Sequence, residues 1–123
     1  MSILSGHCIL VVEDEPLIAL NLESVLSEAG AEVIGPALTV AAALQLSVTP
    51  GLTSAIVDLR LQNQSARPVI ECLVRHGIPF CLHSGQTEMA PENSWPDATV
   101  LIKPANDHDI IGVLAGLRRP VAK

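Results

Sequence analysis

Aromatic residues are almost missing from this sequence, whose 123 residues include one Trp, one Phe and no Tyr. A core without aromatic rings has to be built from Leu, Ile, Val and Ala, a composition typical of a buried parallel sheet covered by helices. Hydrophobic residues make up 49% of the chain, and at this length a second core would leave too few residues for each. The sequence therefore predicts a single domain across residues 1–123.

Basic residues are also scarce. Seven Lys and Arg stand against thirteen Asp and Glu, which gives a net charge of −6. A surface of this sign repels the phosphate backbone of nucleic acids, so we expect no direct binding to DNA or RNA. Protein partners or cations are favoured instead.

Cysteine is too rare and too scattered for a disulfide framework or a zinc site. The three cysteines, Cys8, Cys72 and Cys81, lie far apart among apolar neighbours. We expect each of them to be a small buried hydrophobic residue.

Membrane and export signals are lacking. Residues 1–6 carry no basic stretch, and no apolar run approaches the roughly 18 residues that a membrane span needs. The expected location is the cytoplasm, with no membrane partner.

Apolar runs alternate with helical periodicity along the chain. Strands are expected at Cys8–Val12, Glu32–Pro36, Ala55–Val57, Ile78–His83 and Val100–Ile102. Helices are expected from Pro16 to before Gly30, from a Thr39 cap to before Pro50, from Pro68 to before Gly77, and from an Asn106 cap to Pro120, with Arg118 and Arg119 complementing the last helix dipole. This order predicts βαβ units and a mainly parallel sheet.

Two segments have distinct patterns. Val69, Ile70, Leu73 and Val74 are predicted to share the buried face of the third helix. Residues 85–100 are polar and interrupted by two prolines, so the fourth crossover should be short or irregular.

Polar side chains follow four of the five expected strands. In strand order they are Glu13-Asp14-Glu15, Asp58, Ser84-Gly85 and Lys103. In an open parallel sheet, ligands bind beyond the carboxyl ends of the strands. The sequence therefore predicts that carboxylates, a hydroxyl and an ammonium group converge on one rim.

Carboxylates brought together in this way need a cation. Two like charges about 4 Å apart repel by roughly 4 kcal/mol at an effective dielectric constant of about 20. Mg²⁺ suits such a rim because it takes one or two carboxylates and keeps other positions for water and phosphate. Lys103 supplies a point charge for phosphate, and Ser84 can donate to its oxygens.

These groups together favour phosphoryl transfer, in which catalysis is mostly positioning and charge neutralisation. A carboxylate can be the nucleophile. Asp58 is the better candidate because it stands alone after its strand, whereas Glu13 and Asp14 are adjacent and suited to sharing the cation.

Four stretches resemble the receiver domains of response regulators in two-component systems. They are Leu10-Val11-Val12-Glu13-Asp14-Glu15-Pro16, Ile56-Val57-Asp58-Leu59, Ser84-Gly85 and Lys103-Pro104. The resemblance spans nearly the whole chain. It implies an α/β, flavodoxin-like fold: a doubly wound five-stranded parallel sheet of order 2-1-3-4-5 with helices on both faces.

The resemblance also implies a role for each site residue. Asp58 would accept the phosphoryl group, and Mg²⁺ would be held by Asp14, Asp58 and the backbone carbonyl of Arg60, with Glu13 in the outer shell. Ser84 would be the switch hydroxyl and Lys103 the phosphate contact, followed by a cis bond before Pro104. The chain would be a phosphoacceptor regulator, not an enzyme, and its partners would be a sensor histidine kinase or histidine phosphotransfer protein and a downstream protein.

Residues 78–85 further resemble alphaproteobacterial single-domain receivers that carry a Pro-Phe-x-Phe-Ala-Thr-Gly-Tyr stretch. The chain departs from it at Leu82, His83, Ser84 and Gln86. His83 is expected to be a packed or partly exposed residue at the strand end, and a role in pH sensing or proton relay stays open.

Val100 stands where many receivers have an aromatic residue, so signalling by an aromatic rotamer is excluded. We expect phosphorylation to rearrange residues 86–96, where Trp95 would report on, or belong to, the partner surface.

Other functions compete with this interpretation. A flavin carrier would share the fold class, but Glu13-Asp14-Glu15 would repel its phosphate. An aspartate-dependent phosphatase usually has a second acid two residues after the nucleophile, where this chain has Arg60. A receiver-like interaction module that works without phosphorylation is the remaining alternative. With twenty residues after Lys103, no output domain is expected, so the signal would pass by partner binding, by phosphorelay or by draining a shared kinase.

Overall fold

The computed structural model describes residues 3–85 and 98–117. Its strands are β1 (Cys8–Val12), β2 (Glu32–Ala37), β3 (Ser54–Val57), β4 (Arg60–Leu61), β5 (Gln64–Ser65), β6 (Phe80–Ser84) and β7 (Thr99–Ile102). Its helices are α1 (Pro16–Glu28), α2 (Val40–Leu46), α3 (Arg67–Arg75) and α4 (Asp107–Gly116).

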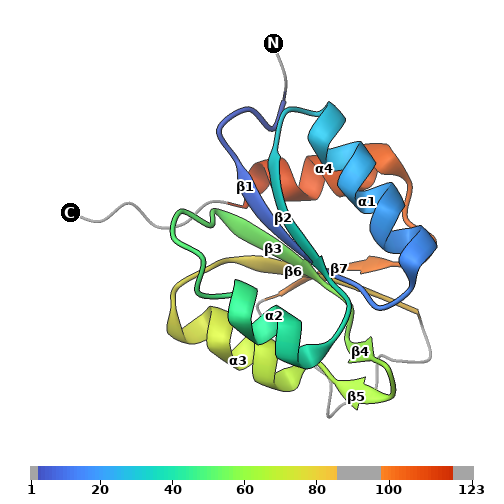
Figure 1. Ribbon diagram of the computed structural model, residues 1–123. Coiled ribbons are helices and arrows are strands. Elements are labelled where there is room, and N and C mark those ends of the chain that lie inside the picture. Colours follow the sequence, from blue (N-terminus) through green and yellow to red (C-terminus); the bar gives the residue numbers. More distant parts are fainter. Residues whose placement is uncertain (1–2, 86–97, 118–123) are drawn as a thin grey trace.

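The main sheet is parallel and has five strands in the order β2-β1-β3-β6-β7. Helices α1 and α4 cover one face, and α2 and α3 cover the other (Figure 1). The doubly wound fold and the strand order predicted from the sequence are confirmed.

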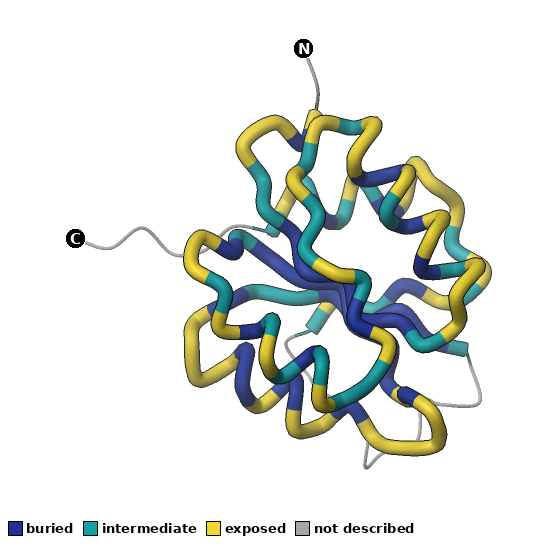
Figure 2. The backbone as a smooth tube through the Cα atoms, in the orientation of Figure 1, coloured by how far each residue is buried: buried dark blue, intermediate teal, exposed yellow. Residues whose placement is uncertain are grey.

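Strand side chains alternate between the two cores. Leu10 and Val12 of β1 pack with α2 and α3, whereas Ile9 and Val11 pack with α1 and α4. The same alternation runs along β3 and β6, and both faces of the central strands are buried (Figure 2). Each fully buried aliphatic side chain contributes about 1.5–3 kcal/mol through the hydrophobic effect, so this inner sheet is the rigid base on which the site stands.

Two helix caps predicted from the sequence are confirmed. Thr39 Oγ1 accepts a hydrogen bond from the backbone N–H of Ala42 at 3.1 Å, at the start of α2. Asn106 Oδ1 accepts one from the N–H of Asp109 at 2.8 Å, at the start of α4. Each cap satisfies one backbone donor that the first helical turn leaves unpaired.

Gly35 sits where β2 shifts its register against β1. Its φ is +97°, and a Cβ atom there would lie 2.7 Å from the backbone N of Ala37 and 3.0 Å from the carbonyl O of Val11. Only glycine fits both constraints. The shifted strand presents the carbonyl of Ala37 to the N–H of Glu13 at 3.0 Å, which fixes the chain at the point where β1 leaves the sheet.

A small antiparallel hairpin, β4-β5, follows β3 and was not predicted from the sequence. Its two turn residues, Gln62 and Asn63, have φ values of 52° and 67°. Positive φ at both central positions belongs to a two-residue hairpin turn whose twist matches the strands. Leu61 anchors the hairpin in the core with no exposed surface.

Some sequence expectations were wrong. Val74 does not share the buried face of α3 but is 56% exposed, and Cys72 is buried there instead. Cys8 is partly exposed, because it opens its strand, while Cys72 and Cys81 are buried as predicted.

Other expectations lie outside the described residues. They concern residues 86–97, with Trp95 among them, and Arg118, Arg119 and Pro120. Among the residues that the structure describes, no helix is both long and apolar enough to cross a membrane.

Candidate functional site

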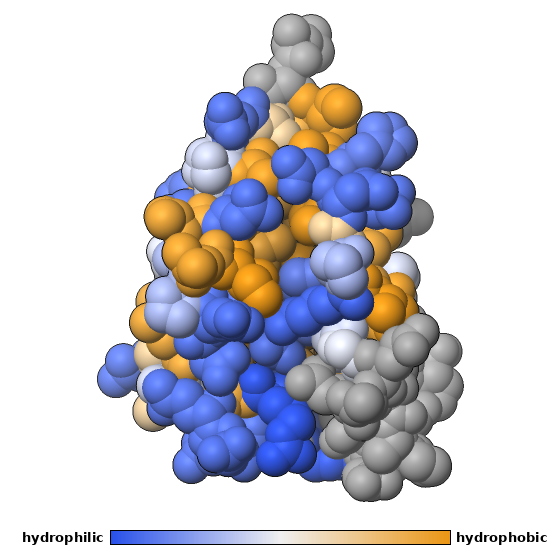
Figure 3. Space-filling model, turned by 90° about the vertical axis from the view of Figure 1, so that its right-hand side faces the viewer, coloured by the Kyte–Doolittle hydropathy of each residue, from blue (hydrophilic) through white to orange (hydrophobic). Residues whose placement is uncertain are grey.

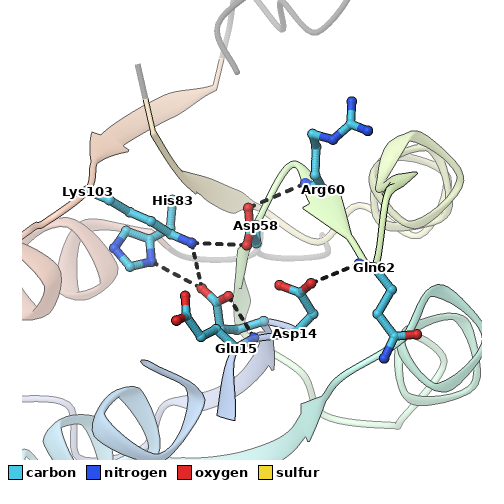
Figure 4. Close-up of polar contacts among 8 residues, drawn as sticks. Asp14, Glu15, Asp58, Arg60, Gln62, His83 and Lys103 are labelled. Atoms are coloured by element: carbon cyan, nitrogen blue, oxygen red, sulfur yellow. Dashed lines mark hydrogen bonds and ion pairs between the residues drawn. The ribbon is translucent and has the colours of Figure 1, made fainter. Parts of the chain in front are cut away.

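The loops after β1, β3 and β7 bring carboxylates and one ammonium group together at a single rim of the sheet (Figure 4). Glu13 comes directly after β1 and Asp58 directly after β3. Both continue the alternation of Val11 and Ile56, which face the α1 and α4 side. The convergence expected from the strand ends is therefore present.

Lys103 is the ammonium group at the centre of this rim. Its Nζ lies 3.0 Å from Asp58 Oδ2 and 3.1 Å from Glu13 Oε1. Burial alone would lower the pKa of Lys103, but hydrogen bonds and charge attraction from Asp58 and then Glu13 outweigh burial and raise it. Lys103 therefore stays charged and bridges two carboxylates.

Glu13 is completely buried. Its Oε2 accepts a hydrogen bond from the backbone N–H of Glu15 at 3.2 Å. Burial, helped by the nearby charge of Asp58 and opposed by Lys103, raises the pKa of Glu13 from 4.5 to about 7. Folding therefore disfavours the charged form of Glu13.

Backbone N–H groups orient the two aspartates. The N–H of Gln62 donates to Asp14 Oδ2 at 2.8 Å, and the N–H of Arg60 donates to Asp58 Oδ1 at 3.3 Å. The first contact depends on the β4-β5 hairpin and was missed from the sequence. The Gln62-Asn63 pair was a weak turn signal, because Asn tolerates positive φ but Gln does not favour it.

Three of these carboxylates could share a cation. Ligand oxygens of Glu13, Asp14 and Asp58 all lie within 4.8 Å of one another, and Asp14 is the one that is partly exposed. Oxygen ligands with one solvent-facing carboxylate suit a hard divalent cation that keeps bound water. The residues present therefore fit Mg²⁺.

Ser84 and His83 end β6 and are both buried. The carbonyl of Ser84 accepts a hydrogen bond from the N–H of Lys103 at 2.8 Å, so the two residues hold neighbouring places on the rim. His83 packs at the strand end, as expected, and its Nδ1 lies 3.8 Å from Glu13 Oε1. Burial, with the charge of Lys103, lowers the pKa of His83 to about 4, so the imidazole is neutral at pH 7.

A cavity of about 260 Å³ lies between the rim and α1. Asn21, His83 and Lys103 form its polar part, and Leu17, Leu22, Pro104 and Ile110 are among its apolar walls. The α1 side of the molecule presents apolar surface above a hydrophilic area (Figure 3). Leu17 and Leu20 on α1 are 79% and 61% exposed.

Comparisons with known proteins agree with this fold. No family model matches the chain. The Phyllosphere-induced regulator PhyR of Methylorubrum extorquens is 32% identical over 110 residues, which cover 84% of this chain and 41% of that protein. The chain thus spans about two fifths of the length of this curated relative.

Two solved structures match over most of both chains. The solution structure of SdrG from Sphingomonas melonis Fr1 is 36% identical, with a TM-score of 0.78, and the match covers 94% of this chain and 97% of that one. The crystal structure of a response regulator receiver protein from Sinorhizobium medicae WSM419 is 25% identical, with a TM-score of 0.76 and coverage of 89% and 91%.

Proposed function

Because the chain belongs to the receiver-domain family of response regulators, we propose that it accepts a phosphoryl group on Asp58 in a Mg²⁺-dependent reaction. The donor is a sensor histidine kinase or a histidine phosphotransfer protein. Residues 1–123 act as one receiver domain that signals to a separate protein. The observation that carries the proposal is the 3.0 Å contact of Asp58 with Lys103 on a rim that holds two further carboxylates.

Asp14 and Asp58 would hold Mg²⁺ together with the backbone carbonyl of Arg60, and Glu13 would act from the outer shell. Support comes from the closeness of the three carboxylates and from the raised pKa of Glu13, which marks a buried negative charge in need of a cation. The ion, when bound, neutralises the carboxylates and the oxygens of an incoming phosphoryl group.

Asp58 is the nucleophile in this proposal. One of its carboxylate oxygens forms a bond to phosphorus while the bond from phosphorus to the donor's imidazole nitrogen breaks, and the electron pair stays on that nitrogen. Lys103 then turns its charge to the new phosphoryl oxygens, and the hydroxyl of Ser84 donates to one of them. The chain is a regulator that catalyses only its own phosphorylation and dephosphorylation.

The partners are proteins. Leu17 and Leu20 are exposed on α1, and Leu17 lines the cavity that reaches Lys103. Apolar surface beside a reactive rim favours contact with another protein. The net charge of −6 speaks against nucleic acid. Phosphotransfer from each kinase and phosphotransfer protein of the same organism, measured in parallel, would identify the donor by the fastest transfer.

Intact-mass labelling tests the phosphoacceptor directly. The protein is treated with a small phosphodonor in Mg²⁺ or in excess chelator, and the mass of one phosphoryl group is expected in Mg²⁺ alone. Asp58→Asn should abolish the label, whereas Asp107→Asn, which changes an exposed carboxylate in α4, should keep it.

Two outcomes contradict the proposal. Equal labelling of Asp58→Asn would move the acceptor elsewhere, and full labelling in chelator would remove the role of Mg²⁺. A wild-type protein that takes no label from any donor would instead favour the interaction module that works without phosphorylation.

A further inference from the structure

Glu13 Oε1 is faced by two nitrogen donors at different distances. Lys103 Nζ is 3.1 Å away, within ion-pair contact, and His83 Nδ1 is 3.8 Å away (Figure 4). Hydrogen bonds from nitrogen to oxygen are about 2.7–3.2 Å long, so His83 Nδ1 lies within about 1 Å of a hydrogen bond to Glu13 Oε1, an oxygen that has the ion pair with Lys103 but no hydrogen-bond partner among the described residues.

His83 is unusual in another respect. It is 4% exposed, yet neither of its ring nitrogens has a hydrogen-bond partner among the described residues. Buried polar groups normally have partners, because leaving one unpaired costs about 1–3 kcal/mol. An unpaired imidazole beside a buried carboxylate is therefore placed where it can gain a bond.

The ring also has room to move. His83 borders the cavity of about 260 Å³, so a small rotation is not blocked by the close packing found elsewhere in a protein core. Its pKa of about 4 keeps it neutral at pH 7, with one N–H to donate.

Lys103 cannot serve every negative group at once. In the structure it bridges Asp58 and Glu13. A phosphoryl group on Asp58 brings new oxygens that compete for the same ammonium group, and the buried Glu13 Oε1 would then lose its ion pair with Lys103.

We propose that His83 is a positioning residue for Glu13. When Lys103 turns from Glu13 to a phosphoryl group on Asp58, the Nδ1–H of His83 moves in and donates to Glu13 Oε1. The inference rests on the proposed function and adds to it a second donor, which keeps Glu13 ordered in the phosphorylated state.

Two substitutions test the hydrogen-bond donor of His83 separately from its aromatic ring. His83→Phe keeps an aromatic ring beside the cavity and removes the donor, whereas His83→Asn places an amide nitrogen near the position of Nδ1 and keeps a donor. Beryllofluoride, which mimics a phosphoryl group, is titrated with Mg²⁺ and followed through the amide NMR signals near Asp58.

The expected result is a loss of affinity for beryllofluoride of about tenfold in His83→Phe, because a hydrogen bond to a buried charged group is lost in the bound state only. His83→Asn should bind close to wild type. Equal affinity of His83→Phe and wild type, or an equal loss in both variants, would overturn the proposal.

A spectroscopic measurement on the wild-type protein tests the same bond without substitution. The chain has four histidines, and the ring signals of His83 are identified by their absence in His83→Phe. On adding beryllofluoride, a proton on Nδ1 should become slow to exchange with solvent and give its own signal.

The positioning role of His83 and the phosphoacceptor site give different results if they are wrong. If the amide signals near Asp58 shift but the ring of His83 does not respond, the positioning role is wrong and the phosphoacceptor site stands. If neither responds, the phosphoacceptor site falls and the positioning role falls with it.

Discussion

Glu13→Gln should make the protein more stable at neutral and alkaline pH, although it removes a carboxylate that we propose acts on Mg²⁺ from the outer shell. Glutamine has nearly the shape of a protonated glutamate but carries no charge. Glu13 is completely buried, and its charged form is disfavoured by burial and by Asp58, even with Lys103 at 3.1 Å. Removing the charge therefore removes a cost of folding.

The size and the sign follow from the pKa. A pKa raised from 4.5 to about 7 corresponds to a loss of about 3 kcal/mol in unfolding free energy when Glu13 is charged, since a shift of one pKa unit is worth about 1.4 kcal/mol. Between these two values the folded state binds more protons at Glu13 than the unfolded state does. The stability of the wild-type protein therefore falls as the pH rises through this window, and the full cost is present above it.

Urea unfolding in chelator measures the effect, because a bound cation would mask it. The difference in unfolding free energy between Glu13→Gln and wild type should be near zero below pH 4.5, grow with pH, and level off at about 3 kcal/mol above pH 7. Glu15→Gln is the matched control, because Glu15 is exposed, and it should change stability little at any pH.

A gain in unfolding free energy that stays constant with pH, or shrinks as the pH rises, would contradict this prediction. Either result would mean that the charge of Glu13 is not what folding disfavours. Mg²⁺ should reduce the difference between the two proteins, because the ion stabilises the charged form of Glu13 in the wild type alone.

Three further predictions concern the same rim. Lys103→Ala should leave the fold and cation binding largely intact but uncouple phosphorylation from conformational change, so amide NMR with beryllofluoride should show shifts confined to the surroundings of Asp58; wild-type shifts throughout would contradict this. Gly35→Ala should lower the unfolding free energy by about 1–3 kcal/mol, because the added Cβ would lie 2.7 Å from the backbone N of Ala37 at a φ of +97°. A variant that is as stable as wild type in urea would show that this position does not require glycine. Gln62→Gly should keep the N–H that is bonded to Asp14 and relieve the positive φ of 52°, which should raise the unfolding free energy by a few tenths to about 1 kcal/mol. Thermal unfolding measures it, and an unchanged or lower melting temperature would contradict strain at this residue.

The sequence alone determined the order of the five strands of the main sheet and of helices α1 to α4. Runs such as Cys8–Val12 are short and apolar throughout, which is typical of a strand covered on both faces. The Thr39 and Asn106 caps mark helix starts by local hydrogen bonding. The strand ends also predicted which residues meet on one rim, because parallel topology brings the loops after the strands to the same edge of the sheet. The prediction failed at Val74, where periodicity could not tell which of two adjacent apolar residues would face the sheet.

Only the tertiary structure decided which residues of the rim contact one another. The bridging of Asp58 and Glu13 by Lys103, and the approach of His83 to Glu13, join residues from separate strands, and no spacing in the sequence encodes a distance between them. The β4-β5 hairpin that holds Asp14 likewise depends on a backbone conformation at Gln62 that the residue itself does not favour. The types of group at a site can be inferred from sequence because strand ends are local features, but which of them touch is set by packing across the sheet.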